Sequence, residues 1–448
     1  MHPAVGFVFH RWDPIQFVLF DVALVVLAAQ LFGRLFQRFG QPPVIGEVIA
    51  GISLGPSILG HYSHALFPID GLPFLKLLST LGVVSFMFLI GLELRLGHLR
   101  RERRRVAGGV ALLGTIVPFG LGLLMAFALY PSHHQARFLA FAVFMGAAMS
   151  ITAFPVLARI MIEKRMYTKP LGVVTMACAA GDDVLTWATL AFVLAVMSSA
   201  SHLDLPYIIG MALLFAFLMI RVVRPALNRF ADRPLDAVTL SLVVAGVLLC
   251  AFSTAAVGLH EIFGAFVAGA IFPRGKLADQ VRAQMSSMAT ILLPMFFVVT
   301  GLNVDIAGVG LAGIWQFALI LLVACSGKFI GGILGARANG LKMRESVALG
   351  VLMNTRGLTE LIVLNIGLQA GVIDAKLFSL LVLMAVVTTV ATGPLLDAIK
   401  PDPYLGEPPS LDAEAHAEGI LAAEQAGGFD DPSASQVEIA VDTSGPGP

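Results

Sequence analysis

Long apolar segments separated by short polar or charged connections recur from residue 15 to residue 398. A helix of roughly 20 apolar residues crosses the hydrocarbon layer of a bilayer. Dividing the chain at charge clusters, prolines and glycines predicts thirteen membrane helices. Their ranges are 15–36, 43–60, 73–94, 106–130, 136–162, 170–198, 205–223, 236–258, 260–273, 285–302, 311–336, 345–370 and 377–398. A composition of 57% hydrophobic and 13% charged residues agrees with an all-α polytopic membrane protein.

Basic residues between the segments lie almost entirely in every second connection. The largest cluster is Arg100–Arg105, whereas the intervening connections hold only Lys76, Arg137 and Lys376. Lysine and arginine mark the cytoplasmic side of short loops. We therefore expect a cell (inner) membrane protein with its N-terminus outside and its C-terminus in the cytoplasm. Because merging or missing one helix would break this alternation, the charge pattern also favours thirteen spans.

The remaining composition excludes several classes of function. The net charge is zero, which makes nucleic acid an unexpected partner. The three cysteines lie inside apolar segments without metal-ligand spacing, so we expect no disulfide and no cofactor. Glu47 and Glu93 lie near the cytoplasmic half, where pairing with Arg38 or the Arg100–Arg105 cluster is favoured over ion binding. His133 falls in an outer loop, where an exposed side chain is favoured over a pH-sensing one.

Two short motifs recur between the halves of the chain. Residues 45–51 (IGEVIAG) resemble residues 263–269 (FGAFVAG), and residues 86–93 (FMFLIGLE) resemble residues 295–302 (MFFVVTGL). Both matches jump seven helices, an odd number, so the two halves face opposite ways across the membrane. The pattern predicts two inverted repeats, an architecture typical of secondary transporters.

The same offset pairs segment 136–162 with segment 345–370, and both are interrupted. The first contains Ser150, Thr152 and Pro155, and proline disfavours a helical conformation in the residue before it. The second contains the polar run 354–360 with Gly357. Broken helices at equivalent places in both halves indicate a transporter's binding site. The alternative is a simple proline kink and a buried Arg356–Glu360 ion pair at i, i+4.

Asp182 and Asp183 stand side by side in an apolar run from about residue 171 to residue 197. Each charge at that depth costs about 2.5–3.5 kcal/mol on insertion scales, which favours a functional role. The alternative is one protonated Asp beside one that is paired with a structural cation. Lys328, inside segment 311–336, can offset the cost of one carboxylate. The other Asp is then free to hold either a proton or a metal cation.

The rest of such a site is predicted from the two interruptions. Hard alkali cations bind oxygen, which Thr152 and carbonyl groups freed by the break can supply. Arg356 and Glu360 would balance charge there. The predicted ion and proton ligands are therefore Asp183, Asp182 and Thr152, with Thr152 and whichever Asp Lys328 does not hold contacting the transported metal ion.

Six motifs resemble those of a known transporter family. The motifs lie at residues 149–159, 181–184, 263–269, 294–297, 327–328 and 353–360. They are similar to the sodium/hydrogen exchanger-like membrane domain of the second cation:proton antiporter family, above all to plant cation/H⁺ exchangers and their bacterial relatives. The resemblance implies that Asp183 carries the ion and proton, and that Asp182 is its partner, held by Lys328.

The resemblance also implies an elevator-type homodimer within the lipid bilayer. Its membrane domain covers residues 1–400, with core helices within 106–198 and 311–398, dimerisation helices within 15–94 and 236–302, and a linker helix at 205–223. Residues 401–448, acidic and without Lys or Arg, are expected to form a disordered cytoplasmic tail.

The sequence thus predicts a transporter, not an enzyme, that exchanges Na⁺ or K⁺ for H⁺. The paired Asp residues with Lys328 are typical of sodium exchangers, whereas the overall likeness to plant exchangers favours potassium, so the choice of cation stays open. The alternatives are a cation channel or transporter-like sensor that uses the same acidic site, and a sodium-coupled solute symporter.

Overall fold

The computed structural model describes residues 14–68, 71–93, 101–133, 135–166, 169–198, 204–231, 233–257, 259–306 and 309–401. The described residues form helices and connections, without a β-strand among them. The predicted tail lies outside these ranges apart from Pro401. Each of the thirteen predicted segments overlaps helical residues, and the segments 43–60, 136–162 and 345–370 each contain two helices separated by a short break.

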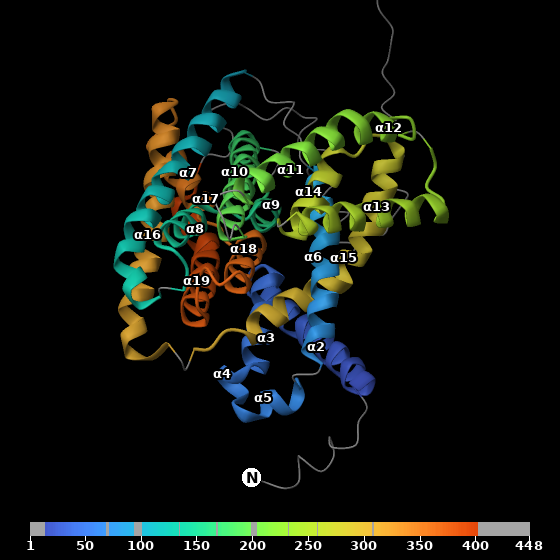
Figure 1. Cartoon of the computed structure of the whole chain (residues 1–448). Coiled ribbons are helices and arrows are strands. Elements are labelled where there is room, and N and C mark those ends of the chain that lie inside the picture. The colour runs from blue at the N-terminus through green and yellow to red at the C-terminus, as the bar shows by residue number, and fades with distance from the viewer. Residues whose placement is uncertain are drawn as a thin grey trace, which may run out of the picture.

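The helices follow one another along the chain as Figure 1 shows. Their bounds are α2 (Pro14–Arg38), α3 (Pro43–Leu54), α4 (Pro56–Leu59), α5 (His61–Leu66), α6 (Leu72–Glu93), α7 (Arg101–Leu129), η1 (Tyr130–Ser132), α8 (Phe138–Ser150), α9 (Phe154–Glu163), α10 (Pro170–Ser198), α11 (Asp204–Leu218), η2 (Met219–Val223), α12 (Arg224–Asn228), α13 (Ala237–Ala256), α14 (Glu261–Ile271), α15 (Lys276–Leu302), α16 (Gly310–Ala338), α17 (Met343–Met353), α18 (Leu358–Gln369) and α19 (Ala375–Ile399). Among the described residues, eight helices are long and apolar enough to span a membrane, or nine if α17 and α18 count as one bent span. The protein is therefore a multi-pass membrane protein, and the number thirteen stays a prediction.

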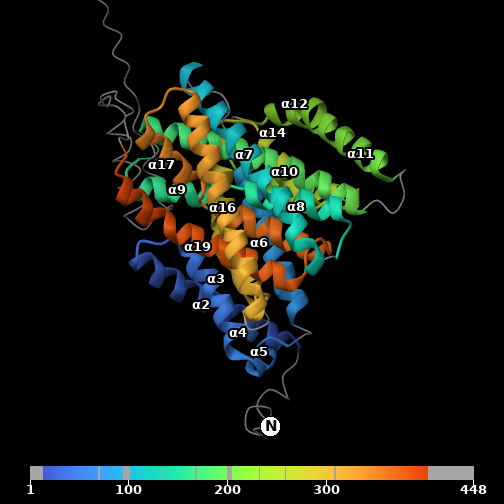
Figure 2. The same ribbon diagram turned by 90° about the vertical axis from the view of Figure 1, so that its left-hand side faces the viewer.

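Small residues bring the long helices together. In α16, Gly327, Gly331 and Gly335 face α7, and a Cβ added to Gly331 would lie 3.0 Å from the Cα of Gly114. Such close backbone approach is the usual way in which helices associate within lipid. Figures 1 and 2 show α7 and α16 side by side in one part of the molecule, while α6, α14 and α15 pack together in another.

The helices α11 and α12 lie at the periphery, as Figure 2 shows. Leu213 and Phe217 of α11 are exposed, with 66% and 57% of their surfaces accessible. An apolar helix that is exposed in the isolated chain fits a surface covered by lipid.

Two helices are interrupted in the middle of the fold, at the places where the sequence predicted breaks. The first pair, α8 and α9, is separated by residues 151–153. The second pair, α17 and α18, bends by 43° across residues 354–357. The N–H of Ala153 donates a hydrogen bond of 2.9 Å to the carbonyl oxygen of Thr355, so the two breaks meet. Pro155 occupies the first turn of α9, where the N–H that proline lacks would have no helical partner.

The predicted exposure of His133 was wrong. His133 was expected to be exposed, but only 2% of its surface is accessible. Its Nδ1 lies 2.7 Å from Oδ2 of Asp374, which precedes α19. The buried ring therefore joins the connection after α7 to the connection before α19.

Candidate functional site

Asp182, in the middle of α10, is fully buried, and each of its carboxylate oxygens has a hydrogen-bond partner. Lys328 Nζ lies 2.9 Å from its Oδ2, and the Thr152 hydroxyl lies 2.9 Å from the same oxygen. The Thr115 hydroxyl lies 2.6 Å from Oδ1. The three partners come from α16, from the first break and from α7. A buried ion pair is stable only when its remaining hydrogen-bonding capacity is satisfied, and this carboxylate meets that condition.

The Lys328 ammonium group also has hydrogen-bond partners, and its side chain has no accessible surface. Besides Asp182, it donates to Thr152 Oγ1 at 2.8 Å and to the carbonyl oxygen of Gly114 at 3.1 Å. An ammonium group has three hydrogens, and each has an acceptor here. The cation is therefore held at one point between α7, α10, α16 and the first break.

Thr152 also links the first break to the second. Its Oγ1 lies 2.9 Å from the carbonyl oxygen of Met353, the last residue of α17. The single hydroxyl hydrogen can go either to this carbonyl or to Asp182. The last carbonyls of a helix have no partner within the helix, so a hydroxyl from the other break satisfies an acceptor that would otherwise be exposed to an apolar interior.

Arg356 makes the opposite connection, from the second break to the first. Its Nη1 donates to the carbonyl oxygen of Ala148 at 2.6 Å, and its Nη2 donates to that of Met149 at 2.7 Å. Both carbonyls belong to the last turn of α8, where a cation also opposes the negative end of the helix dipole. Nη1 lies 3.0 Å from Oε1 of Glu360. The i, i+4 ion pair and the helix break, which were alternative interpretations of the sequence, are therefore both present.

Thr389 of α19 supports the backbone of the second break. Its hydroxyl accepts from the N–H of Arg356 at 3.0 Å and donates to the carbonyl oxygen of the same residue at 2.6 Å. Four further buried polar atoms at or next to this break have no hydrogen bond within the described residues: Asn354 Oδ1, Arg356 Nε, Thr359 Oγ1 and Glu360 Oε2. The second break is thus the more polar and less saturated of the two.

Asp183 belongs to α10, next to Asp182, but its side chain lies outside the described residues. The structure brings together five of the six predicted site residues, namely Asp182, Thr152, Lys328, Arg356 and Glu360. The contacts of Asp183, and hence the predicted cation ligands, stay a prediction.

The sequence did not reveal Thr115, Gly114 or Thr389 as parts of the site. Threonine in a membrane helix commonly bonds the carbonyl four residues earlier, and Thr115 Oγ1 does lie 2.8 Å from the carbonyl oxygen of Ala111. Such a residue looks ordinary until the fold brings Asp182 beside it. A backbone carbonyl such as that of Gly114 has no signal in the sequence.

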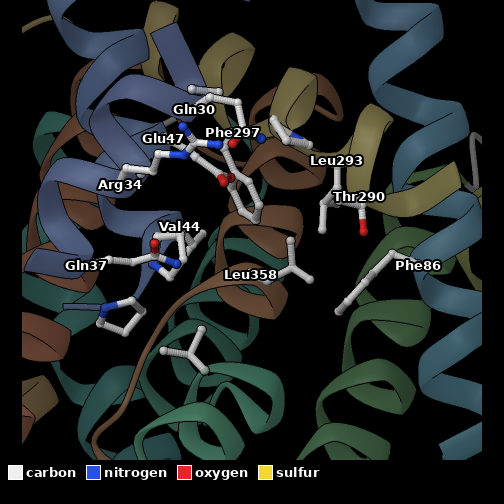
Figure 3. Close-up of a pocket in the computed structure, with 16 residues that line it drawn as sticks. Gln30, Arg34, Gln37, Val44, Glu47, Phe86, Thr290, Leu293, Phe297 and Leu358 are labelled. Carbon is white, nitrogen blue, oxygen red and sulfur yellow. The ribbon is translucent and has the colours of Figure 1, made fainter. Parts of the chain in front are cut away.

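A cavity of about 350 Å³ lies between α2, α3, α6 and α15 on one side and the starts of α9 and α18 on the other. Figure 3 shows Gln30, Arg34 and Glu47 at one wall, with Leu358 facing the space. Val156 and Leu358 come from the first turns of α9 and α18. One end of this space, the α2–α3 cavity, therefore touches the helices that leave the two breaks.

Two discontinuous helices that cross beside a buried carboxylate and ammonium define the membrane part of a secondary transporter. The profile of the family described as "Sodium/hydrogen exchanger, transmembrane" matches residues 23–399. The chain therefore belongs to the sodium/hydrogen exchanger family, which confirms the resemblance drawn from its motifs.

Relatives from distant organisms match most of the chain. It is 40% identical over 401 residues to the Na⁺/H⁺ antiporter NhaS4 of Synechocystis sp., covering 86% of this chain and 98% of that protein. It is 37% identical to Cation/H⁺ antiporter 20 of Arabidopsis thaliana, covering 86% of this chain and 49% of the plant protein. The chain thus spans nearly all of the cyanobacterial relative and about half of the plant relative.

The fold is also that of a solved structure. The sodium proton antiporter MjNhaP1 of Methanocaldococcus jannaschii superimposes with a TM-score of 0.64 at 15% identity, covering 88% of this chain and all of that one. At this identity the comparison shows that the fold is shared, and no more.

Proposed function

We propose that this chain is a secondary active antiporter that exchanges Na⁺ or K⁺ for H⁺ across a cell (inner) membrane. The observation that carries the proposal is the cluster at the crossed breaks, where Lys328 and Thr152 contact Asp182, the residue before Asp183 in α10. The names of the relatives, which are antiporters of sodium or of cations and protons, support the same activity.

The hydrogen bonds around Asp182 support different roles for the two carboxylates. Both oxygens of Asp182 already have partners, so in this conformation Asp182 has the character of a charge-balancing group. Asp183 is then the group that takes up either the proton or the cation. Competition between the two for one carboxylate is sufficient for exchange, provided that the empty site does not reorient. Arg356 and Glu360 balance charge at the crossing.

Thr152 has a conditional role in this scheme. Its hydroxyl oxygen accepts a hydrogen bond from Lys328, so the oxygen becomes a cation ligand only when that ammonium withdraws. Carbonyl groups of the break are the other available oxygens, and hard monovalent cations accept such ligands.

Two glycine contacts support the inverted repeat. A Cβ on Gly51 of α3 would lie 2.8 Å from the Cα of Gly301 of α15, and a Cβ on Gly269 of α14 would lie 3.0 Å from the Cα of Gly91 of α6. The motif match pairs Gly51 with Gly269, and setting residues 86–93 against 296–303 (FFVVTGLN), one residue further along, pairs Gly91 with Gly301. Each repeat therefore supplies the equivalent half of the same helix contact, which an inverted two-fold relation requires.

Alternating access of the elevator type agrees with the asymmetry of the structure. The α2–α3 cavity lies at the end of α2 that the basic connections assign to the cytoplasm. Toward the opposite side, Asn365 Nδ2 of α18 donates to Thr300 Oγ1 of α15 at 2.8 Å, and both residues are buried. We infer a state that is open to the cytoplasm and closed to the outside.

We propose core, dimerisation and linker regions with the boundaries predicted from the sequence. Core helices within 106–198 and 311–398 carry the site, helices within 15–94 and 236–302 form a fixed dimerisation domain, and residues 205–223 link the two. The separate packing of α7 with α16 and of α6 with α14 and α15 supports this division. A homodimer, with the N-terminus outside and the C-terminus in the cytoplasm, completes the proposal.

Reconstitution into proteoliposomes tests the function. An antiporter dissipates an imposed pH gradient when Na⁺ or K⁺ is added, and Asp183→Asn should abolish this response. Asp397→Asn is the matched control, because Asp397 forms an exposed pair with Lys164 away from the site. Normal exchange by Asp183→Asn would show that the carrier is misassigned. A channel would instead pass cations without moving protons, and a symporter would take up an organic solute only with Na⁺.

A further inference from the structure

The α2–α3 cavity is polar along one wall. Gln30, Arg34 and Gln37 follow one another at helical spacing along α2, and Glu47 projects from α3. The facing surfaces are mostly apolar, with Phe86, Phe297 and Leu358, and Thr290 adds one hydroxyl group there (Figure 3). A partly enclosed space with most of its oxygen-bearing side chains along one wall is suited to a small polar ligand that keeps part of its water.

Close packing of α2 against α3 places the charged groups together. A Cβ on Gly46 would collide with the carbonyl oxygen of Phe32, so only glycine permits this approach. A Cβ on Gly33 would lie 3.8 Å from Oε1 of Glu47, which shows that the carboxylate rests against α2 one residue before Arg34. Arg34 and Glu47 therefore line the same part of the cavity.

The cavity ends at the crossed breaks. Val156, which lines it, lies so close to the second break that a Cβ on Gly357 would approach its Cγ2 to 2.6 Å. Leu358, which also lines it, is the first residue of α18. Thr152 lies four residues before Val156 in the sequence, in the break that precedes α9. A cation in the cavity is thus next to the segment that holds the proposed ion site.

We propose that the α2–α3 cavity is an entry site for a hydrated alkali cation, in which Glu47 binds the cation and the Arg34 guanidinium competes with it for that carboxylate. The proposal rests on the proposed antiport function. The amide oxygens of Gln30 and Gln37 add neutral ligands of the hard type that alkali cations prefer. A volume of about 350 Å³ accommodates roughly ten waters at about 30 Å³ each, enough for an ion with its first shell.

If the Arg34 guanidinium competes with a free alkali cation for Glu47, removing Arg34 and removing Glu47 should change the apparent cation affinity in opposite directions. Without the Glu47 charge, the entry site binds cations less well, and a higher concentration is needed to reach half-maximal exchange. Without the Arg34 charge, the carboxylate is more available, and a lower concentration suffices. A purely structural ion pair predicts instead that both substitutions act in the same direction, through loss of folded protein.

The test measures exchange against cation concentration in membrane vesicles of both orientations. Glu47→Gln should raise KM about three- to tenfold for Na⁺ or K⁺ presented on the cavity side, and Arg34→Gln should lower it by a similar factor. Vmax, and KM from the opposite face, should stay within about twofold, because the final site is unchanged. Glu47→Asp, which keeps the charge, should restore most of the wild-type KM.

Arg38→Gln is the matched control, since Arg38 lies one turn further along α2 and does not line the cavity. The proposal is overturned if Glu47→Gln and Arg34→Gln give the KM of Arg38→Gln, or if both shift KM in one direction. Wild-type vesicles that exchange neither cation for protons would instead refute the antiport function itself, so the two failures are distinguishable.

Discussion

The ammonium of Lys328 lies 2.9 Å from Oδ2 of Asp182, and neither side chain has accessible surface. Of two adjacent carboxylates in one helix, the fold thus gives the first a fixed positive partner. Because Lys328 and Thr115 each contact one of its oxygens and Thr152 lies 2.9 Å from Oδ2, Asp182 has little capacity left for a further ligand in this conformation.

Removing one member of the buried pair should destabilise the protein more than removing both. Lys328→Met leaves Asp182 as an uncompensated buried charge, which costs about 3–5 kcal/mol. The double variant Lys328→Met with Asp182→Asn contains no charge at this point and should recover a large part of that loss. Thermal unfolding in detergent measures both effects.

Equal unfolding midpoints for the single and double variants would contradict the pairing. Neither variant is expected to show normal exchange, so stability and transport are measured separately.

Thr115 should contribute through its hydroxyl group. Thr115→Val keeps the shape of the side chain but leaves Asp182 Oδ1 without its 2.6 Å donor, at a cost of about 1–3 kcal/mol. Thr115→Ser keeps the hydroxyl and serves as the control. If valine and serine give the same unfolding midpoint, the hydrogen bond to Asp182 has no energetic importance.

Asn365 and Thr300 should influence transport rate as a pair. Their hydrogen bond of 2.8 Å joins α18 to α15, and under the proposed elevator motion these two helices separate. Asn365→Ala and Thr300→Val should each change Vmax, and the double variant should behave like either single one. Exchange rates arranged as a double-mutant cycle measure the coupling. Additive effects would mean that the bond does not oppose the motion.

Asp374 should stabilise the connections before α8 and before α19 in a pH-dependent way. Partial burial raises the pKa of Asp374, but hydrogen bonds from His133 and from the N–H of Leu377 outweigh it and hold the pKa below the ordinary value of 3.8. A depressed folded pKa means that the contribution is present above pH 3.8 and is lost as the pH falls through the lower folded value.

Two substitutions separate the effects at Asp374. Asn caps α19 as well as Asp does, so Asp374→Asn tests the charge, whereas Asp374→Ala also removes the cap at about 0.5–2 kcal/mol. The stability difference between wild type and Asp374→Asn should be present at neutral pH and shrink on acidification. A difference that grows toward low pH would contradict the assignment.

The sequence predicted the helices and the two breaks because both leave local signals. Apolar length marks a span, and Pro155 and Gly357 interrupt apolar runs. It also placed Asp182, Thr152 and Lys328 in one site, since buried charges need partners. The count of thirteen spans, the repeat and the domain division remain predictions that the described residues do not test.

Other features of the site and the fold depend on contacts between segments that are far apart in the sequence, and such contacts leave no local sequence signal. His133 is polar and lies in a loop, which favours exposure, yet the fold buries it against Asp374. Thr115 and Thr389 resemble any threonine in a membrane helix until α10 and the second break come near them. The α2–α3 cavity is formed by six helices, so no single segment indicates it.

The reciprocal bonds of the two breaks have a consequence for how the centre of the protein opens. Thr152 satisfies a carbonyl of α17, Arg356 satisfies two carbonyls of α8, and Ala153 donates to Thr355. Neither break can leave its place without exposing backbone groups of the other to an apolar interior. The four half-helices therefore form one cooperative unit, and the amide hydrogens of Ala153 and Arg356 should exchange with solvent deuterium at a common rate.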